Sequence, residues 1–408
     1  MIFAKDFLKS FNKLDYDFDR PDISLYNFHR QFLVALALNG IFQKNRKSLF
    51  RFILPTLFIM ILVSGTALEI LFVFHGVLVE DFAFATECFF YVLVLGGSLL
   101  AYSCTLLNTN GIYELLENMN GQLLIWQCFI MWIGFIFVIA FAFISNTYVS
   151  LFWQSLFAEQ NEHIVRPLIF PMWLPEDDPY RTPNYEVFMF FNMLIIFIVI
   201  KSFGVYIYAT LHYLIHYHTM MELIIFDLEA LFVDIDDSAA QLPRDHEMRI
   251  RLQCLLNSRL KRISTWHSDV FKAVDMLSIV YGPTLVYQSL FSSLAICAMA
   301  YQVADQLEHG KFNYLFTLLT TAACVQLFIP CYLGTKIRDK VRIRCFNSGF
   351  HMSPAGPLVR DDLLFIIMRS QRQLAFKFVC LPCLTLETFS SVMSTAYSYF
   401  NMLRQSTK

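Results

Sequence analysis

Seven long apolar segments constrain the fold of this chain more than any other feature of the sequence. An α-helix of about 20 residues rises roughly 30 Å, which is the thickness of the hydrocarbon core of a bilayer. In lipid the backbone polar groups must be paired within the segment, so each segment is predicted to be a helix. The segments have the approximate limits 50–74, 84–107, 124–150, 186–212, 275–302, 312–335 and 383–404. We therefore predict an all-α, polytopic membrane protein with seven transmembrane helices.

The composition agrees with this class and excludes others. Of the 408 residues, 57% are hydrophobic and 16% charged, against about a quarter charged in ordinary soluble domains. A net charge of −2 gives no basic surface of the kind that nucleic-acid-binding proteins show. No nucleophile elbow, P-loop, H-E-x-x-H or dinucleotide fingerprint occurs, so we expect neither an enzyme nor a cofactor. Cys380 and Cys383 form a CxxC that lacks a second pair, so no metal site is expected.

The basic residues are distributed unevenly between the two sides of the predicted bundle. With the amino terminus in the cytosol, the cytosolic segments hold 24 Lys and Arg and the opposite side holds 4. The positive-inside rule therefore places the amino terminus in the cytosol and the carboxyl terminus outside. The loop 108–123 contains no basic residue and does not follow the pattern, but the other loops outweigh it.

The segments between the spans suggest a division of the chain. Residues 1–49 are predicted to be a cytosolic amino-terminal segment, and 50–335 to contain the first six helices. Within the latter, 213–274 is charged and helically patterned over its second half, as expected for spanning helices that continue into the cytosol. Residues 336–382 contain an amphipathic helix, whose apolar face must be buried. We predict that these cytosolic pieces form a domain where subunits meet, and that 383–408 holds the seventh helix and the carboxyl terminus.

The predicted outer loop at 152–186 carries five prolines and several aromatic residues. Proline every few residues is incompatible with a long helix and suggests a folded lid over the bundle. Its aromatic side chains could cover an external cavity, or the loop could simply pack on the bundle. The prolines are Pro167, Pro171, Pro175, Pro179 and Pro183.

Three polar side chains near the fourth span, Lys201, His212 and His216, each have more than one interpretation. Lys201 lies inside the span, where a charge could line an ion path, reach the interface or pair with a carboxylate. His212 and His216 share a helix face, yet no carboxylate or cysteine completes a zinc-binding set. Histidines at the membrane interface are the simpler interpretation.

A small-molecule pocket is predicted in the outer half of the bundle, where aromatic residues accompany a few hydroxyls and amides. Such a cavity suits a small, volatile and mostly apolar ligand. The alternative is that these side chains are ordinary helix-packing core. The candidate residues are Thr86, Phe89 and Phe90 on the second span, Asn146, Ser150 and Trp153 near the third, and Phe188 and Asn192 on the fourth.

The last apolar segment carries one narrow polar stripe. Read at helical spacing, its polar residues recur at steps of three and four, which places them on one face. The stripe consists of Glu387, Ser391, Ser394, Ser398, Asn401 and Gln405. A spanning helix with one wet face could form the wall of an aqueous pathway shared by several copies. It could also pack on neighbouring helices with its hydroxyls bonded to backbone.

Several stretches of the sequence resemble those of the insect odorant receptors, and the resemblance runs over the whole chain. They are the loop WLPEDDPYRTPNYE, the run FIPCYLGTKI at Phe328 to Ile337, and the terminal pattern LLFIIMRSQRQLAF followed by LETFSSVMSTAYSYFNMLR. The closing motif that is usual in the related gustatory receptors is absent.

The resemblance implies a ligand-gated, non-selective cation channel built as a tetramer in the plasma membrane of olfactory sensory neurons. It implies that each subunit contributes its last helix to a central pore and that the chain assembles with the shared odorant co-receptor. The co-receptor has a much longer second cytosolic loop than 213–274, so this chain is similar to a tuning subunit. The family pattern places the gate at Met402, where a branched aliphatic residue is more common, beside the pore candidates Ser394, Ser398, Asn401 and Gln405.

Three other functions were weighed against the odorant-gated channel. A seven-helix receptor that signals through a G protein would have the opposite orientation in the membrane. A gustatory-type ligand-gated channel is the second alternative. A transporter would ordinarily show repeated halves or broken helices, and neither is visible in the sequence.

Overall fold

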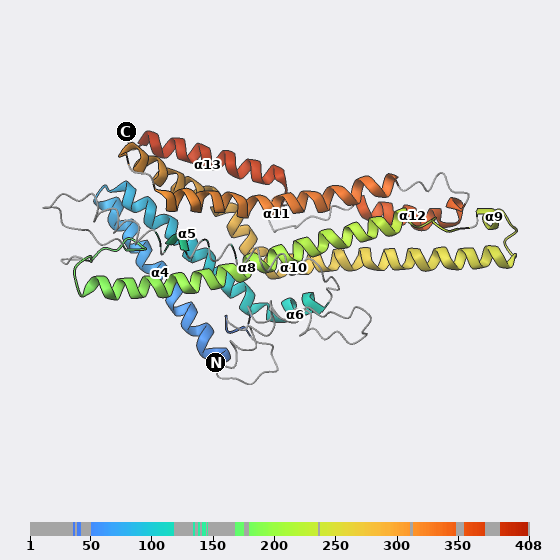
Figure 1. Cartoon of the computed structure of the whole chain (residues 1–408), viewed down its shortest axis with the longest axis horizontal. Helices are drawn as coiled ribbons and strands as arrows, with labels where there is room; N and C mark the ends of the chain where they lie inside the picture. The colour runs from blue at the N-terminus through green and yellow to red at the C-terminus, as the bar shows by residue number, and fades with distance from the viewer. Residues whose placement is uncertain are drawn as a thin grey trace.

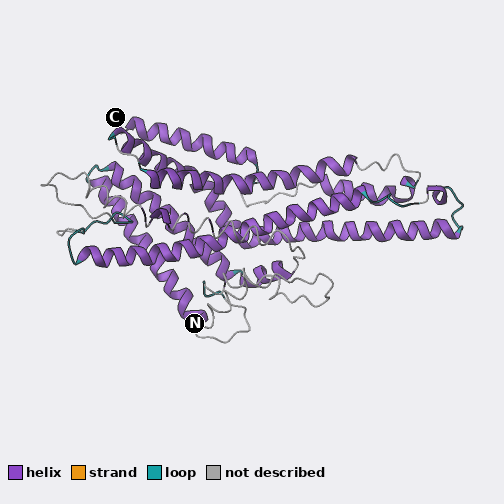
Figure 2. Cartoon of the chain, viewed as in Figure 1, coloured by secondary structure: helices purple, strands orange, loops and turns teal. Residues whose placement is uncertain are grey.

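The computed structural model consists of helices joined by loops. It describes residues 36, 39–41, 50–117, 134, 138, 141–143, 145, 168–174, 179–235, 237–310, 313–347, 355–371 and 384–406. Throughout these residues the regular structure is helical and contains no strand (Figure 2). The prediction of an all-α fold is therefore confirmed for the part of the chain that the structure describes.

The helices follow one another in Figure 1 as long rods packed side by side. In chain order they are α4 (Phe50–Leu78), α5 (Phe82–Leu107), α6 (Thr109–Glu117), α8 (Asn184–Glu229), α9 (Asp237–Ala240), α10 (Glu247–Glu308), α11 (Tyr314–Asn347), α12 (Gly356–Gln371) and α13 (Leu386–Ser406).

Five of the described helices are long and apolar enough to cross a membrane. They are α4, α5, α8, α10 and α11, which correspond to the first, second, fourth, fifth and sixth predicted spans. Of the third predicted span, 124–150, the six described positions are helical and the others lie outside the described residues. The last span corresponds to α13, whose 21 residues are long enough but include the polar stripe.

Two helices are much longer than a bilayer is thick. The 46 residues of α8 and the 62 residues of α10 correspond to lengths of about 70 Å and about 93 Å. Both helices pass without a break through the predicted ends of their spans, at 212 and 275. Figure 1 shows α8, α10 and the end of α11 extending together away from the other helices, with α9 and α12 at the far end. Within 213–274, α8 contains the residues up to Glu229 and α10 those from Glu247, each in one helix with the preceding or following span.

The core between these helices is rich in buried tyrosines. Tyr206, Tyr213 and Tyr217 of α8 are each almost fully buried. The Tyr213 hydroxyl donates to the Ile112 carbonyl at 3.4 Å, and the Tyr217 hydroxyl donates to the Ala273 carbonyl at 3.3 Å. Buried tyrosines need such partners, because a phenolic hydroxyl without one is costly to bury. The hydroxyls therefore tie α8 to its neighbours inside an otherwise apolar interior.

Helix α13 lies along α10 and α11 at one side of the bundle (Figure 1). Its start is fixed by a backbone contact, since the Leu386 N–H donates to the Thr335 hydroxyl of α11 at 2.9 Å. Gly334 is buried at the same place, where an added Cβ would overlap the Leu384 carbonyl oxygen. At the other end Arg404 pairs with Glu308 of α10 at 2.6 Å. These contacts position α13 directly against two of the long helices.

Candidate ligand-binding site

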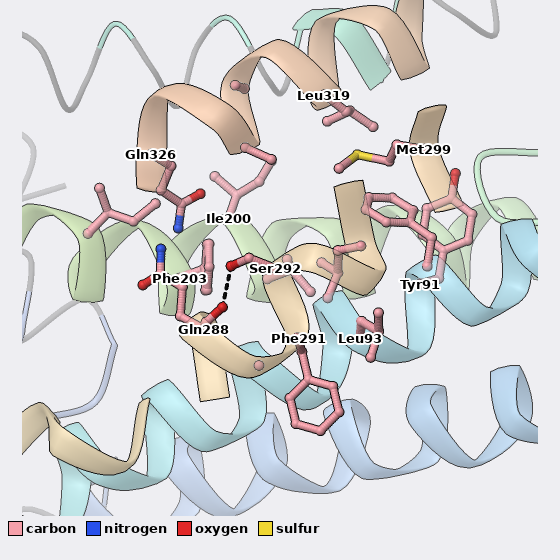
Figure 3. Close-up of a pocket in the computed structure, with 18 of the residues that line it drawn as sticks. Tyr91, Leu93, Ile200, Phe203, Gln288, Phe291, Ser292, Met299, Leu319 and Gln326 are labelled. Atoms are coloured by element: carbon pink, nitrogen blue, oxygen red, sulfur yellow. Dashed lines mark hydrogen bonds between the residues drawn. The ribbon is translucent and has the colours of Figure 1, made fainter. Parts of the chain in front are cut away.

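A cavity lies among α5, α8, α10 and α11, and its volume is about 200 Å³. Pockets for drug-sized ligands usually measure about 300–1,000 Å³, so this one suits a smaller molecule. Its wall is mostly aliphatic and aromatic, with a few polar side chains. Figure 3 shows that wall, including Tyr91 and Leu93 of α5, Ile200 of α8, Met299 of α10 and Leu319 of α11.

Aromatic rings form one end of the cavity. Phe90 and Tyr91 extend from α5, and the Tyr91 ring meets the Phe170 ring edge-on with 4.6 Å between centroids. The Phe90 ring lies 5.8 Å from that of Phe316 on α11. Edge-to-face pairs at such distances are favourable beyond the apolar area that they bury. The end of the cavity is therefore closed by a set of rings that support one another.

Phe170 comes from the loop before α8 and closes the cavity from outside the four helices. The loop is held by two hydrogen bonds, from the Tyr91 hydroxyl to the Ile169 carbonyl at 3.3 Å and from the Asn192 amide to the Phe170 carbonyl at 3.4 Å. Ile169 and Phe170 are buried. The described part of the predicted loop at 168–174 thus both packs on the bundle and supplies an aromatic side chain to the cavity wall.

A glycine makes room for the aromatic wall on the opposite side. Gly97 of α5 lines the cavity, and a Cβ there would lie 3.0 Å from Cε1 of Tyr287 on α10. Tyr287 therefore packs directly against the α5 backbone, and its hydroxyl donates to the Leu93 carbonyl at 2.9 Å. The Tyr287 ring in turn lies 4.5 Å from the ring of Phe291, which also lines the cavity.

The polar side chains of the wall come from α10 and α11. Thr284, Gln288 and Ser292 follow one another at steps of four residues on α10, and Gln326 extends from α11. The Tyr206 hydroxyl donates to Gln288 Oε1 at 2.7 Å, and the Ser292 hydroxyl donates to the Gln288 carbonyl. Among the lining residues none is charged. The cavity can therefore bind a neutral molecule through apolar contact and a small number of hydrogen bonds.

Of the predicted pocket residues that the structure describes, one lines this cavity and the others lie nearby on the same helices. Phe90 lines the cavity, while Thr86, Phe89, Phe188 and Asn192 are on the helices that frame it without being part of its lining. Thr86 instead accepts a hydrogen bond from Gln302 at 3.0 Å. Asn192 is buried and holds the backbone of Phe170. The remaining candidates Asn146, Ser150 and Trp153 lie outside the described residues.

The lining residues of α10 and α11 are absent from the predicted set. Their segments are apolar on most faces, and the lining side is marked only by a few polar residues, such as Thr284, Gln288 and Ser292 at steps of four on α10. A usable signal was present in Gln288 and Gln326, because an uncharged carboxamide in the middle of an apolar span needs a hydrogen-bonding partner.

The predicted pore candidates lie on the face of α13 that points away from the rest of the chain. Ser394, Ser398, Met402 and Gln405 are exposed, and Asn401 is half-buried. The Ser398 hydroxyl donates to the Ser394 carbonyl at 3.0 Å. The opposite face packs on α10 and α11 through residues such as Val392 and Ala396, which are buried.

The intramembrane lysine contacts aromatic rings. The Lys201 ammonium lies 4.8 Å from the ring centre of Phe58 and 5.0 Å from that of Phe197. Both distances are within the range of a cation–π interaction, which offsets part of the cost of a charge in the membrane. His212 and His216 are buried on α8, and the described residues contain no cluster of three or more metal-ligating side chains.

The helices and the cavity together define a polytopic, all-helical membrane protein with a small-molecule pocket between its helices. Comparison with known proteins makes the assignment specific, because the profile of the 7tm Odorant receptor family matches residues 98–397. The chain belongs to this family of receptors.

Relatives and solved structures agree with the family. Odorant receptor 13a of Drosophila melanogaster is 26% identical over 168 residues, which are 36% of this chain and 38% of that receptor. Odorant receptor 82a of the same fly is 24% identical over 249 residues, which are 59% of this chain and 58% of that receptor. The alignments thus span less than two thirds of these relatives.

The structure of the insect olfactory receptor OR5 from Machilis hrabei superposes with a TM-score of 0.64 at 16% identity. The match covers 93% of this chain and 98% of that one. The same receptor in complex with eugenol gives a TM-score of 0.63 at 17% identity. This likeness shows that the two chains share a fold.

Proposed function

We propose that this chain is the odorant-binding subunit of a heteromeric, odorant-gated, non-selective cation channel. The observation that carries the proposal is the mostly apolar, uncharged cavity of about 200 Å³ in a chain of the odorant receptor family. Its aromatic and aliphatic wall favours a small volatile ligand, because apolar surface leaves water there and few hydrogen bonds are lost. The eugenol complex of the Machilis hrabei receptor supports a small-molecule ligand for the shared fold.

Ligand binding opens the channel through the helices that form the cavity wall. Helices α10 and α11 line the cavity and also pack directly against α13. A ligand that fits the wall better in the open arrangement shifts the population toward it by the difference between its two affinities. Because α13 lies on the same two helices, a change in their packing alters its position without a further intermediary.

The pore is formed by the exposed stripe of α13 from several subunits. Ser394, Ser398, Asn401 and Gln405 give the wet face, and Met402 is the gate. The Asn401 and Gln405 amides would be costly facing lipid, whereas a water-filled path shared by four helices satisfies them. The partners are copies of the shared odorant co-receptor in a tetramer, and lipid surrounds the assembly.

The proposed topology places the amino terminus in the cytosol and the carboxyl terminus outside. The cytosolic parts are residues 1–49, the extensions of α8 and α10 within 213–274, and the segment 336–382, which anchors the subunits to one another. The spans within 50–335 carry the pocket in their outer half, and 383–408 carries the pore helix. The chain acts in the plasma membrane of olfactory sensory neurons.

Current recording tests the proposal directly. The chain is expressed together with the odorant co-receptor, and cells with the co-receptor alone are the control. We expect odorant-dependent cation currents whose ligand profile requires this chain. A chain that reaches the cell surface but gives no current with any odorant of a broad panel would refute the proposal.

An epitope tag at the carboxyl terminus separates the channel from a receptor that signals through a G protein. The proposed topology predicts antibody labelling on intact cells. Labelling that appears only after permeabilisation would favour the G-protein alternative.

A further inference from the structure

We infer that the ligand of this cavity carries a hydrogen-bonding oxygen at one end, and that Gln288 and Gln326 recognise it. The inference rests on the proposed function and specifies its ligand class. It assigns a neutral aldehyde, ketone, ester or alcohol with an apolar remainder, in preference to a hydrocarbon of the same shape. The two carboxamides are specificity-determining residues of the cavity wall.

Gln288 offers a directed donor because one half of its carboxamide is already engaged. Its Oε1 accepts a hydrogen bond from the Tyr206 hydroxyl at 2.7 Å. Tyr206 is itself almost fully buried on α8, so it fixes the orientation of the amide. The Gln288 Nε2 has no hydrogen bond to any described residue, and the side chain lines the cavity. An oxygen acceptor of the ligand would satisfy it.

Gln326 and Thr284 add further unsatisfied polar groups to the same wall. The Gln326 carboxamide makes no hydrogen bond within the described part of the chain, although it is half-buried in the cavity lining. Thr284 lies one helical turn before Gln288 and is 2% exposed, and its hydroxyl likewise lacks a partner among the described residues. Buried polar groups are normally paired, because an unmade hydrogen bond costs more than a made one contributes.

The carboxamides of Gln288 and Gln326 lie on the same side of the cavity (Figure 3). Figure 3 shows the carboxamides of Gln288 and Gln326 at one end of the view, with Tyr91 and Met299 at the other. The Tyr91 hydroxyl already donates to the Ile169 carbonyl, so Tyr91 presents mainly its ring to the ligand. A ligand with one polar and one apolar end therefore has a single favoured orientation. Since no lining residue is charged, a charged ligand would lose its hydration without gaining an ionic partner.

The test compares ligand pairs in which a C=O group is replaced by a C=CH₂ group of nearly the same shape. Suitable pairs are acetophenone with α-methylstyrene, benzaldehyde with styrene, and heptanal with terminal octene. Half-effective concentrations are measured as currents of the complex with the co-receptor and as thermal stabilisation of the purified complex. We expect the oxygen compound to act at a roughly two- to tenfold lower concentration in the wild type.

Substitutions show whether the preference for the oxygen compound comes from the carboxamides or from a difference in solubility between the two ligands. Gln326→Leu and Gln288→Met keep the side-chain size and remove the donor, so each should abolish most of the preference for oxygen. The ratio within a pair is compared between variants, and the different partitioning of the two ligands then cancels. Gln302→Leu is the matched control, because Gln302 is a glutamine of α10 outside the lining, bonded to the Ala83 carbonyl at 2.6 Å.

The outcomes distinguish this inference from the proposed function. Equal potency within the pairs, or a preference that survives both lining substitutions, overturns the inference while odorant-dependent current still supports the channel. If Gln302→Leu removes the preference as fully as the lining substitutions do, the two carboxamides are not specific and the inference also falls. A complex at the surface that answers to no ligand refutes the proposed function, and this inference with it.

Discussion

The cavity wall and the pore candidate α13 use polar residues in opposite ways. The cavity lies between helices of one chain, and its polar groups face inward among α5, α8, α10 and α11. The polar stripe of α13 faces outward, while the other side of the helix packs on α10 and α11. The difference is that the cavity lies between helices of one chain, whereas the Asn401 and Gln405 amides of the stripe make no hydrogen bond within the described part of the chain. Further chains or water would satisfy these amides.

This contrast leads to an expectation that the two regions can be damaged separately. A change in the cavity wall should alter ligand potency and leave the ion path intact. A change where the start of α13 packs on α11, at Gly334 and Thr335, should alter conduction and leave ligand binding intact. The predictions below test this separation, beginning with the largest expected effect.

Gly334→Val should have the largest effect and should act on conduction. An added Cβ at Gly334 overlaps the Leu384 carbonyl oxygen just before α13. A Cβ and a backbone carbonyl oxygen cannot move aside by a change of rotamer, so the start of α13 must shift. Overpacking of this kind costs about 1–3 kcal/mol. We expect maximal current to fall more than tenfold, while thermal stabilisation of the purified complex by an activating odorant is retained.

The control for this change is Gly134→Val, because a Cβ at Gly134 meets no described atom within 4 Å. The control should leave the current unchanged. If Gly334→Val removed ligand binding together with current, the packing of α13 on α11 and the cavity would depend on each other, and the separation would be wrong.

Ala323→Phe should have the next largest effect and should act on ligand potency. Ala323 lines the cavity from α11, so a phenyl ring there fills space that the ligand needs. We expect the half-effective odorant concentration to rise at least tenfold, which corresponds to about 1.4 kcal/mol or more. Basal current should be unchanged. Concentration–response curves measure both quantities.

Val325→Phe is the matched control on the same helix. Val325 is 48% exposed and does not belong to the cavity wall, so a larger side chain there extends toward the surroundings. An equal loss of potency in both variants would mean that the effect comes from α11 as a whole and not from the filled cavity.

The spanning helices could be predicted from sequence because hydrophobic length determines them directly. The predicted span 84–107 corresponds to α5 at Phe82–Leu107, and 50–74 corresponds to α4 at Phe50–Leu78. The continuation of α8 and α10 beyond their spans was also visible, because the helical pattern persists in 213–274. Each of these features is local, so tertiary packing is not needed to recognise it.

The cavity could be predicted only in part because it depends on how helices face one another. The aromatic character of the wall was expected, and Phe90 belongs to it. Thr86 has the right residue type, yet its hydroxyl accepts from Gln302 instead of lining the cavity. The faces of α10 and α11 that line the cavity follow from packing, which periodicity in a mostly apolar segment does not record.

Met402→Ser should have a moderate effect and should act on basal current. Met402 is 61% exposed at the border of the polar stripe, where we propose the gate. A serine makes a constriction easier to hydrate, so current without odorant should rise severalfold. The odorant concentration for half-maximal thermal stabilisation should stay the same. Patch-clamp recording in the absence of odorant measures the first quantity.

Met393→Ser is the matched control, since Met393 packs against the hydrophobic core on the other side of α13. It should lower stability without raising basal current. If both variants raised basal current alike, loosened packing of α13 would explain the effect, and Met402 would not be the gate.

Glu308→Gln should have the smallest effect, at the ion pair that joins the end of α10 to α13. The Arg404 guanidinium and the Glu308 carboxylate lie 2.6 Å apart, but their side chains are 48% and 55% exposed. An exposed pair of this kind contributes about 0–1 kcal/mol and is screened by salt. We expect a small decrease in the thermal midpoint of the purified complex, which vanishes at high ionic strength. Ligand potency should be unchanged.

A double-mutant cycle with Arg404→Gln shows whether this small decrease belongs to the pair. If the pair matters, the double variant should lose less stability than the sum of the two single variants, because either single substitution already breaks the pair. Additive losses would instead assign the effect to separate contacts of each side chain. A change in odorant potency in any of the three variants would contradict the separation. Glu308 does not line the cavity and is the last residue of α10.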